Sequence, residues 1–310
     1  MENFINLSEY PVEPVLKLLL ADKTTKQNII FATDSYTELG DAYKVDSHID
    51  IDLLLGMDAM EIQPRVLKEA TAQAERTKKK AEVMTPSWVC NKMNNHCDEE
   101  WFRYKDVFNS EDGEHWITRT EPITFPDGKT WQQYVDSMRL EITCGEAPYM
   151  VSRYDTTTGE KIPVKDRVGF LDRKLRVVGE NTDTKEEWMK WVIRAYESSY
   201  GYEYQGDNLL IARINLLITF VDYMEDRWSD KPTNADLRKI ANIITWNIWQ
   251  MDGLSGTVPL LTRPTENRQM NLFDAFGIGP VEEMEMEGIP CRIFDWRAKE
   301  SVEYNSVKER

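Results

Sequence analysis

The middle of the chain alternates strand-like and helix-like segments, and this order constrains the fold more than any other feature. The first segment, MRLEITC, is a short apolar run typical of a buried strand. The expected elements are, in order, a strand at 138–144, a helix at 184–197, a strand at 199–205, helices at 206–228 and 233–246, and a short strand at 247–252. Strands that alternate with helices in this way predict an α/β fold with a parallel sheet.

Polar residues mark where the expected helices begin. Thr184 stands before Glu186 and Glu187, which is the order of an N-cap followed by an acidic first turn. The longest helix is expected to begin near Asp207, and the next has a capping start at Thr233 or Asn234. These signals set the helix boundaries independently of the hydrophobic pattern.

The flanking segments divide the chain into three expected regions. Residues 1–80 are interpreted as a mainly helical N-terminal region, residues 81–255 as the core, and residues 256–310 as a C-terminal extension that forms a subunit interface. The first region includes a helix-prone stretch at 61–80 whose basic end, Lys78–Lys80, is interpreted as an ordinary helix terminus. Two Asp-Gly pairs between 98 and 137 predict turns, and YDTTTGEKIPV predicts another between extended segments.

Composition excludes several classes of protein. The 310 residues carry a formal net charge of −16, so the chain alone should be repelled by nucleic acid. Cys90, His96 and Cys97 do not have a usual zinc spacing, so no metal site is expected and the cysteines should be reduced thiols. No export signal or membrane span is recognisable, which predicts a cytoplasmic protein without membrane contact.

Candidate ligand-binding residues follow the expected strands, since ligands of parallel α/β sheets bind beyond the carboxyl ends of the strands. The first strand leads from Glu141 into Cys144-Gly145, the second ends near Glu203, and the third ends at Asp252. A glycine here either permits a tight turn or leaves room for a ligand near the backbone. The two later acids suit the hydroxyls of a ribose and the exocyclic amine of an adenine.

Two features depart from a simple dinucleotide site. The sequence has no G-x-G-x-x-G motif, and far more than the usual ~20 residues separate the glycine turn from Glu203. An insertion must therefore fill this interval, and the YDTTTGEKIPV region is the expected place for it.

Four segments resemble the γ-type N6-adenine DNA methyltransferases of restriction–modification systems. KAEVMTPSWVCNKM resembles the family segment in which a Thr-Pro pair opens a helix against the methionine end of S-adenosylmethionine. LEITCGEAPY is similar to the D-P-A-C-G-S-G loop, YGYEYQGDNLLIARINLL to the second motif, and NIWQMDGL to the third. Ile142 and Ala147 depart from the proline and the second glycine of that loop.

The resemblance implies a Rossmann-like S-adenosylmethionine-dependent methyltransferase fold, with an incomplete sheet. It implies that S-adenosyl-L-methionine is the cofactor, and that Thr85 caps the Thr-Pro helix with Pro86 in its first turn. The residues implied to bind the cofactor are Thr85, Pro86, Glu141, Cys144, Gly145, Glu203 and Asp252, with Asp252 reading the adenine ring.

The family's catalytic N/D/S-P-P-Y/F motif is absent from this sequence. That motif holds the flipped target base, so no catalytic residue is expected in this chain. The resulting hypothesis is a cofactor-binding subunit of a split enzyme, whose partner supplies the PPY loop and target recognition and contacts DNA within the complex. A non-catalytic methylase-like scaffold or regulator is the alternative, and a stand-alone small-molecule methyltransferase is a third.

Overall fold

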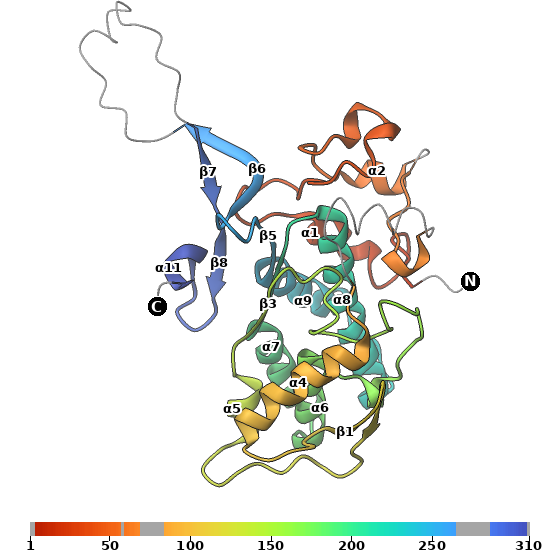
Figure 1. The fold of residues 1–310 in the computed structure, drawn as a ribbon, viewed down its shortest axis with the longest axis vertical. Coiled ribbons are helices and arrows are strands. Elements are labelled where there is room, and N and C mark those ends of the chain that lie inside the picture. The colour runs from red at the N-terminus through yellow and green to blue at the C-terminus, as the bar shows by residue number, and fades with distance from the viewer. Residues whose placement is uncertain (1–3, 57–58, 69–83, 265–285, 309–310) are drawn as a thin grey trace, which may run out of the picture.

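A parallel sheet of three strands lies at the centre of the computed structural model (Figure 1). The strands are β3 (Arg139–Glu141), β4 (Ser199–Glu203) and β5 (Ile248–Gln250), in the order β3-β4-β5. The structure describes residues 4–56, 59–68, 84–264 and 286–308. The predicted α/β fold with parallel strands is confirmed, although the first strand is shorter than expected.

Two pairs of helices connect these strands. They are α6 (Phe170–Asn181), α7 (Lys185–Glu197), α8 (Gly206–Trp228) and α9 (Asn234–Asn247). The predicted helix starts are confirmed, because the Thr184 side chain accepts a hydrogen bond from the Glu187 N–H and Thr233 forms a capping box with Asp236. The long interval between Glu141 and Glu203 therefore holds a loop and two helices, of which α6 was not expected.

The strand order places both helix pairs on one face of the sheet. The connections from β3 to β4 and from β4 to β5 both lead to the next strand in the same direction across the sheet. Connections between parallel strands are right-handed, so both helix pairs lie on the same face. The backbone register puts Leu140, Tyr200, Tyr202 and Trp249 on the opposite face. Tyr202 and Trp249 are buried there, whereas Leu140 is 44% exposed.

The C-terminal part of the chain covers the second face at β4 and β5. It consists of β6 (Thr257–Pro264) paired with β7 (Met286–Pro290), β8 (Arg292–Asp295) paired with β9 (Glu300–Glu303), and α11 (Tyr304–Lys308). Val258, Cys291 and Ile293 pack against Tyr202 and Trp249 in a separate apolar cluster. Within the described residues, no strand pairs with the free edge of β3.

A buried polar cluster joins α4 (Ser87–Phe102) to the free-edge strand and its neighbours. The Asp98 carboxylate accepts from Arg139 and Arg173, each at 2.5 Å, and from the Tyr134 hydroxyl at 3.0 Å. The hairpin β1 (Asn109–Asp112) to β2 (His115–Thr118) and α5 (Trp131–Val135) lie beside this cluster. The hairpin turns at Gly113, whose φ of +63° confirms the first Asp-Gly turn.

The expectation of a mainly helical N-terminal region is wrong for the described residues. They contain two five-residue helices, α1 (Leu16–Leu20) and α2 (Ile51–Leu55). The other helical segments there are short 3-10 turns: η1 (Glu13–Val15), η2 (Thr37–Leu39), η3 (Asp41–Tyr43) and η4 (Arg65–Leu67). A further 3-10 turn, η5 (Val164–Asp166), lies later in the chain. Lys78–Lys80 and most of the helix expected at 61–80 fall outside the described residues.

Local and long-range hydrogen bonds to side chains explain why the N-terminal pattern does not continue as a helix. The Asp22 carboxylate accepts from the N–H groups of Thr24 and Thr25 and turns the chain after α1. The side-chain amide of Gln250 then bonds both the N–H and the C=O of Ile30, at 2.9 and 2.8 Å. An extended segment is therefore fixed beside β5.

The N-terminal region shares its core with the central helices. Val12, Leu16 and Leu19 belong to the same apolar cluster as residues of α8 and α9. The expected boundary near residue 80 lies outside the described residues, and both domain boundaries remain predictions. No helix in the described part of the chain is both long enough and apolar enough to cross a membrane.

Candidate functional site

A cavity of about 480 Å³ opens where β3 ends, and four of the seven residues predicted to bind a cofactor line it. These four are Thr85, Glu141, Cys144 and Gly145. Met84, Arg139 and Tyr149 also line this cavity. Residues far apart in the sequence therefore meet at the carboxyl end of the first parallel strand.

The loop after β3 is built from left-handed backbone conformations. Thr143, Gly145 and Ala147 have φ values of +47°, +54° and +65°. A Cβ atom on Gly145 would lie 3.8 Å from the Met84 sulfur, which is an ordinary contact. Conformation therefore favours glycine at this position more than crowding does. Ala147 adopts the same left-handed conformation, which costs more for alanine than for glycine.

Glu203 links the end of β4 to this loop. Its Oε2 accepts from the Gly145 N–H at 2.9 Å, and its Oε1 accepts from the Gln205 N–H at 3.1 Å. The residue is 6% exposed and does not line the cavity. The structure thus brings Glu203 to the predicted glycine turn as a support for its backbone.

Two polar side chains of helix α8 connect it to the loop, to β5 and to the end of α1. The Asn215 amide donates to the Glu146 carbonyl and to the Tyr154 hydroxyl, both at 3.1 Å. The buried Arg213 donates to the Ile248 carbonyl at 2.8 Å and to the Leu19 carbonyl at 2.5 Å. The Ala-Arg-x-Asn-Leu pattern therefore joins the loop, β5 and the end of α1.

Glu141 is the buried acid of the cavity. It is 7% exposed, its Oε1 accepts from the Tyr149 N–H at 3.3 Å, and its Oε2 is buried without a hydrogen-bond partner. Burial raises the pKa of this carboxyl to about 8, and Glu203 nearby adds to the rise. The side chain is therefore mainly neutral at pH 7.

This pKa shift predicts that the stability of the protein depends on pH, and that Glu141→Gln makes this dependence weaker. The folded-state pKa of about 8 lies above the ordinary value of 4.5, so the folded state holds the proton more tightly. The associated stability is complete below about pH 4.5 and is lost as the pH rises through about 8. Calorimetric melting temperatures between about pH 5 and pH 9 should fall less for the variant than for the wild type. An equal fall of the melting temperature with pH in both proteins would contradict the raised pKa of Glu141. The raised pKa of Asp172 affects both proteins alike.

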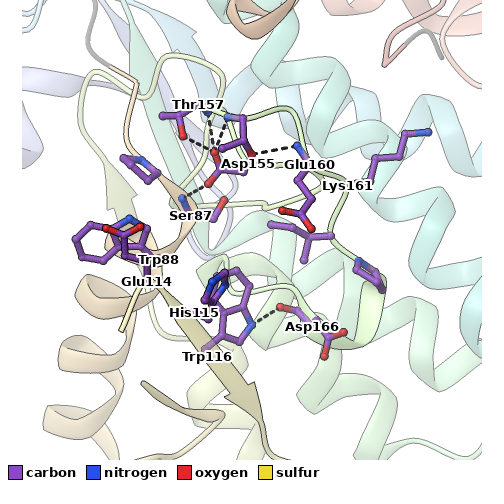
Figure 2. Close-up of a pocket in the computed structure, with 14 residues that line it drawn as sticks. Ser87, Trp88, Glu114, His115, Trp116, Asp155, Thr157, Glu160, Lys161 and Asp166 are labelled. Carbon is purple, nitrogen blue, oxygen red and sulfur yellow. Dashed lines mark hydrogen bonds between the residues drawn. The ribbon is translucent and has the colours of Figure 1, made fainter. Parts of the chain in front are cut away.

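The Thr-Pro segment lies between this cavity and a second one. The N-cap of α4 is Pro86, and no side chain caps the helix locally, so the prediction that Thr85 is the cap is wrong. Asp155, from the loop expected as a turn, accepts from the Ser87 N–H at 2.6 Å (Figure 2). The Thr85 carbonyl accepts a hydrogen bond from the Thr156 hydroxyl at 3.0 Å.

The second cavity has a volume of about 650 Å³ and lies beside the start of α4 (Figure 2). Trp88 from α4, the hairpin residues Glu114 to Trp116 and the 155–166 loop surround it. The Trp116 indole donates to the Asp166 carbonyl at 2.9 Å. Asp155 already occupies the helix terminus, which makes this an unfavourable place for an anionic ligand.

Asp155→Ala should lower the free energy of unfolding by about 1–2 kcal/mol, because a helix cap and three turn bonds are lost. Its carboxylate also accepts from the Thr157 and Thr158 N–H groups, at 2.8 and 2.9 Å. Urea unfolding at pH 7 measures the change. Asp166→Ala on the same cavity is the control, expected within about 0.5 kcal/mol of wild type. Similar free energies of unfolding for the two variants would show that Asp155 does not stabilise α4 as its cap.

Asp252 lies apart from the 480 Å³ cavity. Its carboxylate accepts from the Leu254 N–H at 2.9 Å and stabilises its own turn, as expected of an Asp-Gly pair. Its predicted contact with adenine remains a prediction. The sequence interpretation missed Arg139 and Tyr149 in the cavity, and only their nearness to Glu141 and Cys144 could have indicated them.

Neither a metal-binding group in the described residues nor a similar known protein accompanies this site. Within the described residues, no group of three or more His, Cys, Asp and Glu side chains is placed to hold a metal ion. Comparison with known protein families, with curated proteins and with solved structures finds no match to this chain.

Proposed function

We propose that this chain is the S-adenosylmethionine-binding subunit of a split DNA adenine-N6 methyltransferase with a Rossmann-like fold. One observation carries the proposal: the loop after β3 places Gly145 in a cavity with Thr85 and Glu141, and Glu203 of the next strand supports that loop. Parallel α/β sheets bind ligands at this edge. The cavity volume of about 480 Å³ falls within the range of small-molecule sites.

Each chain segment has a distinct task in this proposal. The Thr-Pro segment and the loop from Thr143 to Ala147 hold the methionine end of the cofactor. Glu203 can still accept from ribose hydroxyls, because a carboxylate has about four acceptor positions. The adenine ring lies toward Asp252. The cofactor supplies an electrophilic methyl group, and this chain positions it.

A partner subunit supplies the target-base loop and most of the contact with DNA. The free edge of β3 and three exposed apolar side chains support this part of the proposal. Met138, Leu140 and Ile142 alternate along and just beyond β3, and they are 68%, 44% and 63% exposed. An apolar edge strand of this kind favours association with another chain. The net charge of −16 suits a subunit whose partner carries the basic groove.

The alternative is a methylase-like scaffold or regulator that binds no cofactor. Two observations favour it: Glu203 gives both oxygens to backbone N–H groups, and Asp252 stabilises its own turn. A scaffold would need these acids for packing alone. Measurement of cofactor binding separates the two functions.

Glu203→Ala should weaken binding of S-adenosylmethionine about tenfold or more, because it removes the support of Gly145 and a ligand acceptor. Isothermal titration calorimetry of the purified chain measures this. Glu114→Ala, on the second cavity, is the matched control and should bind as wild type does. Equal affinity of the Glu203 variant and the wild type would contradict the assigned site.

A further inference from the structure

The 650 Å³ cavity beside the start of α4 has two indole rings in its wall. Trp88 comes from the first turn of α4 and Trp116 from β2 (Figure 2). Both are partly buried, and the Trp116 indole is held by its hydrogen bond to the Asp166 carbonyl. Ile162 and Pro163 add apolar surface from the loop. This wall suits a ligand with an apolar body, and the faces of the indoles attract cations.

The charged side chains of this cavity are mostly acidic. Its lining includes the carboxylates of Glu114, Asp155, Glu160 and Asp166. The lysine of the lining, Lys161, has its Nζ over the Phe4 ring, 6.0 Å from the ring centre, and its side chain points away from the two indoles (Figure 2). Lys92, one turn after Trp88, lies 3.8 Å from the Glu111 carboxylate outside the lining. Among the described residues, no cationic side chain pairs with the four carboxylates of the cavity.

Asp155 contributes a fixed negative charge to this cavity. Its carboxylate accepts from the N–H groups of Ser87, Thr157 and Thr158. Burial opposes its ionisation, but the hydrogen bonds from the Thr157 hydroxyl and from these N–H groups lower the pKa of Asp155 to about 2. The side chain is therefore ionised at pH 7, with its acceptor positions already in use.

The other three carboxylates are free to accept from a ligand, and they are dispersed. Glu114 lies in the turn of the β1–β2 hairpin, whereas Glu160 and Asp166 lie on the loop that faces it. No three acidic, His or Cys side chains in the described part of the chain converge well enough to hold a metal ion. One small cation cannot meet these carboxylates together, whereas a ligand with several separated positive charges can. An anionic ligand would be repelled.

We propose that the 650 Å³ cavity binds an aliphatic polyamine, which is a chain of methylene groups with two or more separated ammonium groups. The ammonium groups pair with Glu114, Glu160 and Asp166, because each is a carboxylate without a cationic partner. The methylene groups pack against Trp88 and Trp116. This inference does not depend on the proposed function, since the Thr-Pro segment separates this cavity from the 480 Å³ cavity.

Isothermal titration calorimetry with spermidine at pH 7 tests the inference. The buffer contains about 0.15 M NaCl, because salt screens the diffuse attraction of any polycation to a chain with a net charge of −16. The wild type should bind one spermidine per chain with saturation. The bound ligand connects the hairpin to the facing loop, so saturating spermidine should also raise the melting temperature.

Two variants test the two parts of the site. Glu160→Gln combined with Asp166→Asn removes two ammonium partners and should weaken spermidine binding about tenfold or more. Trp88→Leu keeps an apolar side chain but removes the aromatic face, and it should weaken binding about threefold or more.

The matched control removes the same amount of charge elsewhere. Glu186→Gln combined with Asp226→Asn changes exposed carboxylates of α7 and α8 that do not line the cavity, and this variant should bind spermidine as wild type does. Equal weakening in both double variants would overturn the inference, because binding would then follow net charge alone.

Competing ligands separate a polyamine site from other kinds of site. Displacement of spermidine by magnesium chloride at the same concentration would reveal a counter-ion effect and overturn the inference. Equally tight binding of N-acetyl-lysine N-methylamide, which has one ammonium group, would overturn it in favour of a pocket for a lysine side chain. An absence of spermidine binding to the wild type would also overturn it. A neutral diol of the same length as spermidine should not bind, and its binding would contradict the role of the carboxylates.

Discussion

Asp98→Ala should destabilise the protein by about 3–5 kcal/mol, because it leaves the buried Arg173 and the partly buried Arg139 without their carboxylate. Arg173 is 1% exposed, and both Arg139 and Arg173 bond to Asp98 at 2.5 Å. The expected loss exceeds that of a surface ion pair because water cannot replace the missing charge. Urea unfolding at pH 7, followed by circular dichroism, measures the change in the free energy of unfolding.

The control for this variant is Glu100→Ala on the same helix. Glu100 is exposed, and its carboxylate lies 3.8 Å from the His96 ring nitrogen, so its replacement should change stability by less than about 0.5 kcal/mol. Equal stability of the two variants would show that the buried cluster does not support the fold.

The double variant Leu140→Asp with Ile142→Asp should abolish assembly with the partner subunit. Leu140 lies on β3 and Ile142 directly after it; both are exposed, and both also line the 480 Å³ cavity. Buried apolar anchors at interfaces contribute about 2 kcal/mol or more each. Burying new carboxylates adds a desolvation cost. Affinity should fall at least about 100-fold, and adenine methylation of DNA by the mixture should be lost.

The assay pairs this chain with the protein encoded by the neighbouring reading frame. Leu254→Asp is the matched control, since Leu254 is 97% exposed and lies after β5, away from the β3 surface. It should assemble and methylate as wild type does. Methylation by this chain alone, or by the double variant with the partner, would contradict the split-enzyme proposal.

Much of the central fold could be predicted because local signals and tertiary structure agree there. Thr184 and Thr233 cap their helices as expected, and the three strands align in parallel. Residues at the ends of adjacent parallel strands must come close, so Gly145 and Glu203 could be paired from sequence alone. The hydrogen-bond partners of Glu203 could not be predicted, because backbone N–H groups compete with a ligand for the same carboxylate oxygens.

The N-terminal region and the cap of α4 could not be predicted, since distant residues determine both. Gln250 fixes Ile30 in an extended conformation although the local pattern favours a helix. Asp155 caps α4 from a loop far along the chain, while Thr85 looks like the cap in sequence. The unsatisfied oxygen of Glu141 is likewise a property of packing, and no local motif indicates it.

Direct titration of the purified chain with S-adenosylmethionine tests the central claim most directly. The account predicts saturable binding of one cofactor per chain by isothermal titration calorimetry, with competition by the demethylated product. Binding should weaken in Glu203→Ala and remain unchanged in Glu114→Ala. An absence of cofactor binding by the wild type, both alone and with its partner, would contradict the account and favour the scaffold.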